Sequence, residues 1–144
     1  MRLGLYSEQA RSDVVAARAY IAARGYRAIL DDIRRCRQDP ALHAEPLARI
    51  LARRDFYATS ECRDLLFHTQ EHRYAIPALA GMLADAGLHF IGFLLEPHVR
   101  RRYVARFPAD RAGADLACWN AFEAENPETF RGMYRFWVQK PIAG

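Results

Sequence analysis

The stretch PALAGMLADAGLHFIGFLLEP, residues 77–97, decides the fold of this chain. Pro77 stands where the first turn of a helix tolerates proline, and small and apolar residues continue the helical pattern to Ala86, where Gly87 ends it. Residues 88–95 are bulky and apolar on both sides of the chain, and Pro97 follows them. Such a run is typical of a buried strand. A helix that leads directly into a buried strand indicates an α/β fold.

Strands are also predicted near both ends of the chain. Leu3 and Leu5 alternate with polar or small residues, so Met1–Tyr6 is predicted as a strand, and Ser7 after it is a good helix N-cap. Tyr134–Gln139 is predicted as the last strand. Helical patterns are predicted over about Glu8–Arg24, Ile29–Cys36, Pro46–Arg53, Glu61–Phe67, Pro97–Phe107 and Ala112–Glu125. We therefore expect a helix-rich α/β chain, with about three strands, that forms a single domain over residues 1–144.

The charge of the chain does not favour a nucleic-acid-binding protein. The formal net charge is +4, and a basic surface attracts phosphate through counterion release. Acidic and basic residues are mixed through most of the chain, as in residues 31–35 (DDIRR), and the one dense basic run is Arg100–Arg102 with Arg106. We interpret that run as a solvated helix face, and nucleic acid as an improbable partner.

The sequence also lacks the patterns of a membrane or secreted protein. The longest uncharged stretch, Tyr74–Ala84, is far shorter than the roughly 20 apolar residues of a membrane span. The first residues run at once into charged sequence without the apolar core of a secretory signal. Cys36, Cys62 and Cys118 are widely spaced and odd in number, which argues against a disulfide framework. A cytoplasmic protein with no membrane contact is expected.

Residues 68–72, HTQEH, match the pattern H-x-x-E-H, in which two histidines bind zinc and the glutamate activates water. Zinc proteases carry this pattern within a helix, whereas the sequence around it here indicates a loop or a helix end. Two other interpretations stay open: a structural metal site shared with Cys62, and a hydrogen-bonded polar cluster. Cys62 with His68 also resembles a nucleophile and base, although nothing marks an oxyanion hole. We predict no metal site and regard Cys62 as a buried structural residue.

The order of these elements resembles the carboxyl-terminal region of bacterial class I S-adenosylmethionine-dependent methyltransferases, of the type often found beside tetratricopeptide repeats. The phrases that carry the resemblance are LGLYS (residues 3–7), CRDLLFH (residues 62–68) with QEHR (residues 70–73), and FWVQKP (residues 136–141). The resemblance implies a partial Rossmann-like sheet with a helical insertion over about residues 8–75. It also implies that the strand Met1–Tyr6 corresponds to the fifth strand of a complete sheet.

The resemblance implies that the cofactor-binding half is missing. In that family the cofactor lies on a glycine-rich turn after the first strand, near an acidic residue that ends the second strand. Both would lie upstream of Met1, so we expect this chain alone to bind no cofactor, although S-adenosylmethionine is implied for the complete enzyme. A strand from the middle of a parallel sheet that lacks its neighbour exposes a hydrogen-bonding edge. A protein partner or a homodimer is expected to cover that edge.

The resemblance places the insertion and residues 68–73 near the carboxyl ends of the strands, on the substrate side. His68, Glu71 and His72 are then candidates to position or deprotonate a methyl acceptor, and Arg73 and Tyr57 are candidates to bind it. Equally, these residues could cap helices and connect the insertion to the sheet. Two alternatives to a substrate-side lobe remain: a non-enzymatic regulatory or protein-interaction module, and a small zinc-binding protein that uses His68, Glu71 and His72.

Overall fold

The computed structural model of the chain describes residues 1–68 and 70–141. Thr69, a free position of the H-x-x-E-H pattern, lies outside the described residues. The chain divides into two compact units, one formed by Met1–Ala10 with the residues from His72 onward, and the other by Arg11–Glu71. The second unit lies within the insertion predicted over about residues 8–75.

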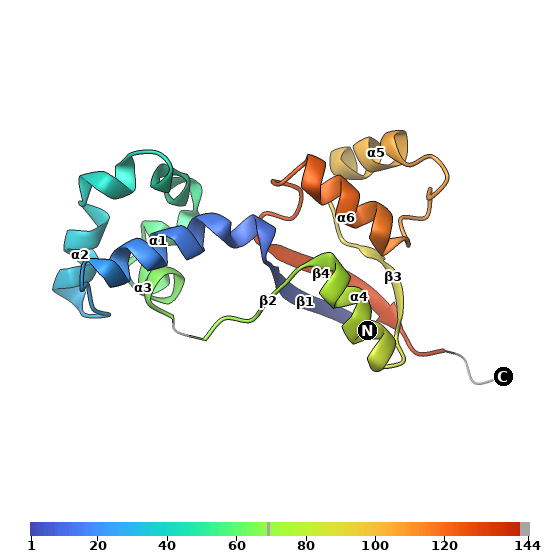
Figure 1. Cartoon of the computed structure of the whole chain (residues 1–144), viewed down its shortest axis with the longest axis horizontal. Coiled ribbons are helices and arrows are strands. Elements are labelled where there is room, and N and C mark those ends of the chain that lie inside the picture. Colours follow the sequence, from blue (N-terminus) through green and yellow to red (C-terminus); the bar gives the residue numbers. More distant parts are fainter. Residues whose placement is uncertain (69, 142–144) are drawn as a thin grey trace. The chain divides into compact units, whose positions relative to one another are not determined.

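The first unit is built on a mixed sheet, whose described strands have the order β2-β1-β4-β3 (Figure 1). The strands are β1 (Arg2–Ser7), β2 (Arg73–Tyr74), β3 (His89–Phe93) and β4 (Met133–Gln139). Because β4 runs antiparallel to both β1 and β3, these two strands are parallel to each other with the last strand between them. The short strand β2 is parallel to β1 and pairs with it at Tyr6 and Ser7.

Three helices of the first unit share one core with the sheet: α4 (Ile76–Asp85), α5 (Pro97–Arg106) and α6 (Leu116–Glu125). The core joins their buried side chains to alternate residues of β4, namely Tyr134, Phe136 and Val138. Tyr103 of α5 stacks on Trp119 of α6 with ring centroids 3.6 Å apart. These aromatic contacts fix the two helices against one face of the sheet.

The opposite face of this sheet carries the other residues of β4. Arg135, Trp137 and Gln139 alternate with the buried ones and are exposed, and Trp137 keeps 44% of its surface accessible. Ile91 on the neighbouring strand is 45% exposed. In the described part of the chain this face therefore remains open to solvent over an aromatic and aliphatic surface.

The second unit is helical. It contains α1 (Ser12–Ala23), α2 (Leu30–Arg37) and α3 (Thr59–Phe67), with short 3₁₀ turns at Gln9–Arg11, Pro40–His43, Leu47–Ala52 and Arg54–Phe56. Its separate core is formed by Val14, Ala17, Ile21, Ile33, Cys36, Leu42, Ile50, Phe56, Cys62, Leu65 and Leu66. The guanidinium of Arg53 donates two hydrogen bonds of 2.7 Å to the Asp13 carboxylate, which joins α1 to the turns before α3.

The α/β class and the positions of the three predicted strands are confirmed, but the prediction of about three strands missed β2. The prediction that the strand within residues 88–95 is buried on both sides is wrong, since His89 and Ile91 of β3 are exposed on the open face of the sheet. The predicted helix over Pro46–Arg53 is a 3₁₀ turn. The predicted helix over Ala112–Glu125 begins only at Leu116. Gly113 has a positive φ of 70°, and Asp115 is the N-cap residue, whose carboxylate accepts hydrogen bonds from the backbone of the first turn. None of the described helices has both the length and the apolar character of a membrane span.

Candidate functional site

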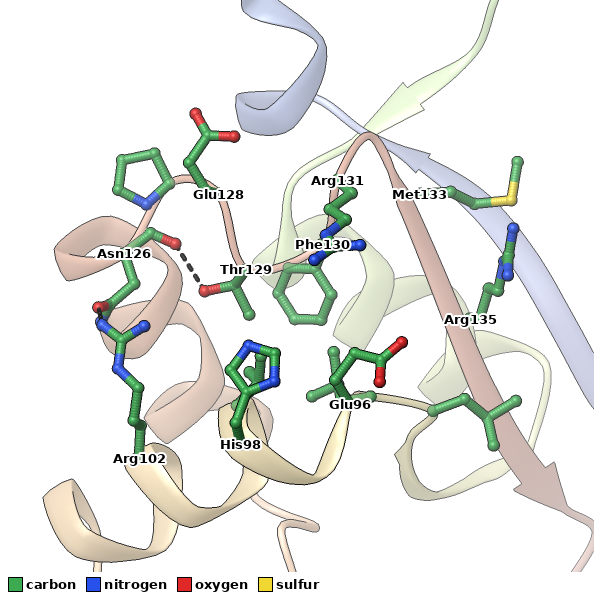
Figure 2. A pocket seen from close by; sticks show the side chains of 14 residues that line it. Glu96, His98, Arg102, Asn126, Glu128, Thr129, Phe130, Arg131, Met133 and Arg135 are labelled. Atoms are coloured by element: carbon green, nitrogen blue, oxygen red, sulfur yellow. Dashed lines mark hydrogen bonds between the residues drawn. The ribbon is translucent and has the colours of Figure 1, made fainter. Parts of the chain in front are cut away.

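A pocket of about 870 Å³ opens where β3 ends and β4 begins. Figure 2 shows that its walls come from four segments of the first unit. These are residues 94–96 after β3, one side of α5, residues 126–131 between α6 and β4, and the start of β4. The side chains that carry charge or polarity are Glu96, His98, Arg102, Asn126, Glu128, Thr129, Arg131 and Arg135.

The pocket lies at the edge of the sheet where ligands are expected. Since β4 is antiparallel to β1 and β3, the carboxyl ends of β1 and β3 and the amino end of β4 share one edge. Open α/β sheets bind their ligands outside the carboxyl ends of their strands. The topology therefore makes this pocket the strongest candidate site in the described part of the chain.

The turn that leads into β4 is strained and borders the pocket. Met133 N–H donates to the Phe130 carbonyl oxygen over 3.0 Å, and both residues between them have positive φ, 47° at Arg131 and 102° at Gly132. Glycine adopts such angles freely, whereas an arginine does so at a cost of about 1 kcal/mol. Strained residues of this kind occur preferentially at ligand-binding sites.

One wall of the pocket is held by hydrogen bonds around Asn126. The Arg102 guanidinium donates to the Asn126 side-chain oxygen, and the Thr129 hydroxyl donates to the Asn126 carbonyl oxygen over 2.6 Å. The Asn126 side-chain nitrogen donates to the Phe122 carbonyl oxygen of α6 over 3.0 Å. These bonds fix residues 126–129, so Arg102 is already engaged with the protein.

A buried carboxyl group lies at the carboxyl end of β1 and is not among the residues that line the pocket. Glu123 of α6 is only 3% exposed and accepts hydrogen bonds from the hydroxyls of Ser7, over 2.7 Å, and Tyr134, over 2.8 Å. Burial raises the pKa of Glu123, and these two hydrogen bonds only partly oppose that shift. The group links β1, α6 and β4, and its burial separates it from any ligand in the pocket.

Among the predicted site residues, Glu71 is committed to a buried ion cluster within the second unit. Its carboxylate accepts two hydrogen bonds from Arg11, of 2.9 and 2.5 Å, and one of 3.1 Å from Arg18. Burial alone would raise the pKa of Glu71, but the two guanidinium groups outweigh it and lower the pKa. A carboxylate held in this way is a poor proton acceptor and a poor ligand for a metal ion.

The two histidines of the pattern do not share a helix face. The helix α3 ends at Phe67, His68 follows it and is exposed, and His72 is exposed as well. The His68 Nδ1 atom accepts a hydrogen bond of 3.2 Å from the Gln70 backbone N–H. In the described residues, no three His, Cys, Asp or Glu side chains come together as a metal site would require.

The remaining predicted residues lie in different surroundings. Arg73 belongs to β2 and is paired beside Tyr6 at the carboxyl end of β1, within the unit that holds the pocket. Tyr57 belongs to the other unit, is 58% exposed, and donates from its hydroxyl to the Leu51 carbonyl oxygen over 3.0 Å. Burial raises the pKa of the Cys62 thiol to about 11, so this cysteine is protonated and unreactive at neutral pH.

The sequence did not predict the pocket because its polar residues form two groups, residues 96–102 and 126–135, that lie far apart in the chain and match no functional motif. The one local signal was Arg131-Gly132 immediately before a strand, since a glycine there indicates a turn. Comparison with models of known protein families and with curated proteins found no match to this chain. The geometry of the pocket and the topology of the sheet are therefore the observations on which a function can be based.

Proposed function

We propose that this chain is the carboxyl-terminal, substrate-side lobe of a class I S-adenosylmethionine-dependent methyltransferase, with a partial Rossmann-like sheet. In this proposal the chain holds the methyl acceptor, and a second, cofactor-binding half completes the enzyme. The proposal rests on the resemblance in sequence and, above all, on the order of the strands.

The strand order supports the proposal in a specific way. The last strand, β4, is inserted antiparallel between β1 and β3, which are parallel to each other and are connected through α4. The sheets of class I methyltransferases end in this manner, with the final strand antiparallel between the two strands before it. In this correspondence β1 is the fifth strand, as the sequence resemblance implies, and the pocket lies on the acceptor side of the sheet.

The free edge of β1 supports the need for a second half. Backbone hydrogen bonds link Met1 with Val138 and Ser7 with Gly132. Because hydrogen-bonded pairs alternate along an antiparallel ladder, the backbone groups of Leu3 and Leu5 also bond to β4. Arg2 and Gly4 then direct their backbone groups toward the other side, where β2 reaches only Tyr6 and Ser7. In the described residues no strand pairs with this part of β1, which leaves room for a neighbouring strand from a partner.

The chain's own residues do not fit the cofactor. Glycine-rich turns after strands hold nucleotide cofactors in doubly wound sheets, but β1 is followed by EQA (residues 8–10) and β3 by LLEP (residues 94–97), without glycine. No step of methyl transfer is therefore assigned to residues of this chain. Its contribution is to bind and orient the acceptor in the pocket.

The free edge can be tested by amide hydrogen exchange measured by NMR on the chain alone. We expect slow exchange at Leu3 and Leu5, whose N–H groups bond to β4, and much faster exchange at Arg2 and Gly4. Equal protection at all four positions, without self-association, would contradict an uncovered edge.

A thermal melt with saturating S-adenosylmethionine tests the missing half. Ligand at about 100 times its dissociation constant would stabilise a binding protein by about 2.7 kcal/mol and move the midpoint by several degrees. No shift is expected for this chain alone. An upward shift would show that the chain has a cofactor site and would refute the division into two halves.

A further inference from the structure

Two guanidinium groups, those of Arg131 and Arg135, line the pocket and have no hydrogen-bond or ion-pair partner among the described residues. Arg131 and Arg135 line it from the side of β4, and His98 lines it from α5 (Figure 2). In residues 1–68 and 70–141 no carboxylate or carbonyl oxygen bonds to either arginine side chain, whereas Arg102 on the opposite wall donates to Asn126. Arg131 and Arg135 are therefore available to a ligand.

The position of Arg131 is unfavourable for the protein itself. Its φ of 47° lies in the left-handed region, which glycine or asparagine occupies at lower cost. Gly132 follows with a φ of 102°, so the turn needs two residues with positive φ. An arginine at the first of these positions gains no bond within the described structure in return, and it is one of the residues that line the pocket.

The pocket also limits the kind of ligand. Glu96 and Glu128 line it together with the arginines, and their charges disfavour a ligand with negative charge spread over its whole length. Phe130 and Met133 add apolar surface beside the two arginines. The arrangement suits one localised anionic group attached to an apolar or aromatic body, because planar guanidinium groups bind carboxylate and phosphate oxygens in pairs.

We propose that the pocket binds the single carboxylate or phosphate group of a small organic molecule, with Arg131 and Arg135 as its anion-binding residues. That this molecule is the methyl acceptor rests on the proposed function. The anion-binding site itself rests on the pocket alone. His98 supplies a further hydrogen-bonding group on the opposite wall, from the first turn of α5.

The test is an NMR titration of the whole chain with benzoate, phenyl phosphate and benzamide, which is the neutral counterpart of benzoate. One of the two anions should shift the backbone signals of residues 96–99 and 128–135, and should bind about tenfold or more tightly than benzamide. The better of the two identifies the acidic group. The binding should weaken as salt is added, because the arginines are exposed.

Variants separate the anion site from general effects. Arg131→Gly and Arg135→Gln should each lower the affinity for the anion about tenfold, and Arg131→Gly should not lower the melting midpoint, because glycine relieves the positive φ. Arg101→Gln, on an exposed part of α5 away from the pocket, is the matched control and should bind normally.

Equal binding of benzamide and benzoate, unchanged affinity in both variants, or no shift with either anion at about 50 mM would overturn the proposal. These results are distinguishable from failure of the proposed function. If the chain binds the anion but joins no cofactor-binding partner, the anion site stands and the methyltransferase proposal is refuted. If the chain joins such a partner but binds no anion, only the anion site is refuted.

Discussion

Replacement of Glu71 distinguishes a structural from a catalytic role for the most prominent sequence motif. The Glu71 side chain is 6% exposed, and those of Arg11 and Arg18 are 9% and 16% exposed. Glu71→Gln would remove the carboxylate charge that these two largely buried guanidinium groups share. Removal of one partner of a buried ion pair typically costs about 3–5 kcal/mol. We expect a loss of this size, or a fall of about 10 °C in the melting midpoint.

The assay is urea unfolding followed by circular dichroism at neutral pH. Glu61→Gln is the matched control, since Glu61 is exposed in the first turn of α3 and should change the stability by no more than about 0.5 kcal/mol. His68→Ala and His72→Ala replace exposed residues and should have similarly small effects. A cycle that combines Glu71→Gln with Arg18→Gln should give a coupling energy between about 0.5 and 3 kcal/mol.

The pH dependence of the Glu71 effect has a definite sign. The pKa of Glu71 is lowered in the folded protein, so its stabilising contribution is complete above the unfolded-state pKa of about 4.3. The contribution is lost as the pH falls through the lower, folded-state pKa, and the wild type and Glu71→Gln should converge there. A loss below about 1 kcal/mol at neutral pH would refute this account and restore Glu71 as a candidate catalytic residue.

Three further predictions concern other parts of the chain. Because the pKa of Glu123 is raised by burial, its contribution to stability falls as the pH rises from about 4.3. The free energy of unfolding of Glu123→Gln should therefore increase relative to wild type by up to about 1.4 kcal/mol per pH unit until the folded-state pKa is passed. A constant difference in urea unfolding from pH 4 to 8 would contradict this. Cys36 and Cys62 are fully buried, whereas Cys118 is half-buried, so a thiol reagent should label Cys118 first even though burial and the neighbouring Asp115 also raise its pKa. Mass spectrometry would show the order, and equal rates would argue against a closed core. Gly113→Ala places a side chain at a φ of 70° and should cost about 1–3 kcal/mol, whereas a neutral effect on the melting midpoint would argue against this turn geometry.

The strands and most helices could be predicted from sequence because their signals are local. The run from Pro77 to Pro97 contains the helix, the glycine that ends it and the strand that follows, all within one stretch. The strand β2 has only two residues and no period of its own, since its pairing with β1 depends on the folded chain. Short pairs of this kind are invisible to periodicity.

The candidate site could not be predicted in the same way. The H-x-x-E-H pattern suggested chemistry at Glu71, but the arginines that neutralise it lie 60 and 53 residues away in sequence. The pocket likewise combines residues from α5 with residues at the start of β4. Only the strand order brings these segments to the same edge of the sheet.

The most direct test of the central proposal is to isolate the protein from its native source in the complex or longer chain in which it occurs, and to irradiate that sample with radiolabelled S-adenosylmethionine. The account predicts that the label attaches to a polypeptide segment with a glycine-rich turn after a strand, outside residues 1–144, and that this segment pairs with the edge of β1. Label within residues 1–144 would contradict the division into two halves. Absence of any labelled segment would contradict the methyltransferase proposal and favour a non-enzymatic interaction module.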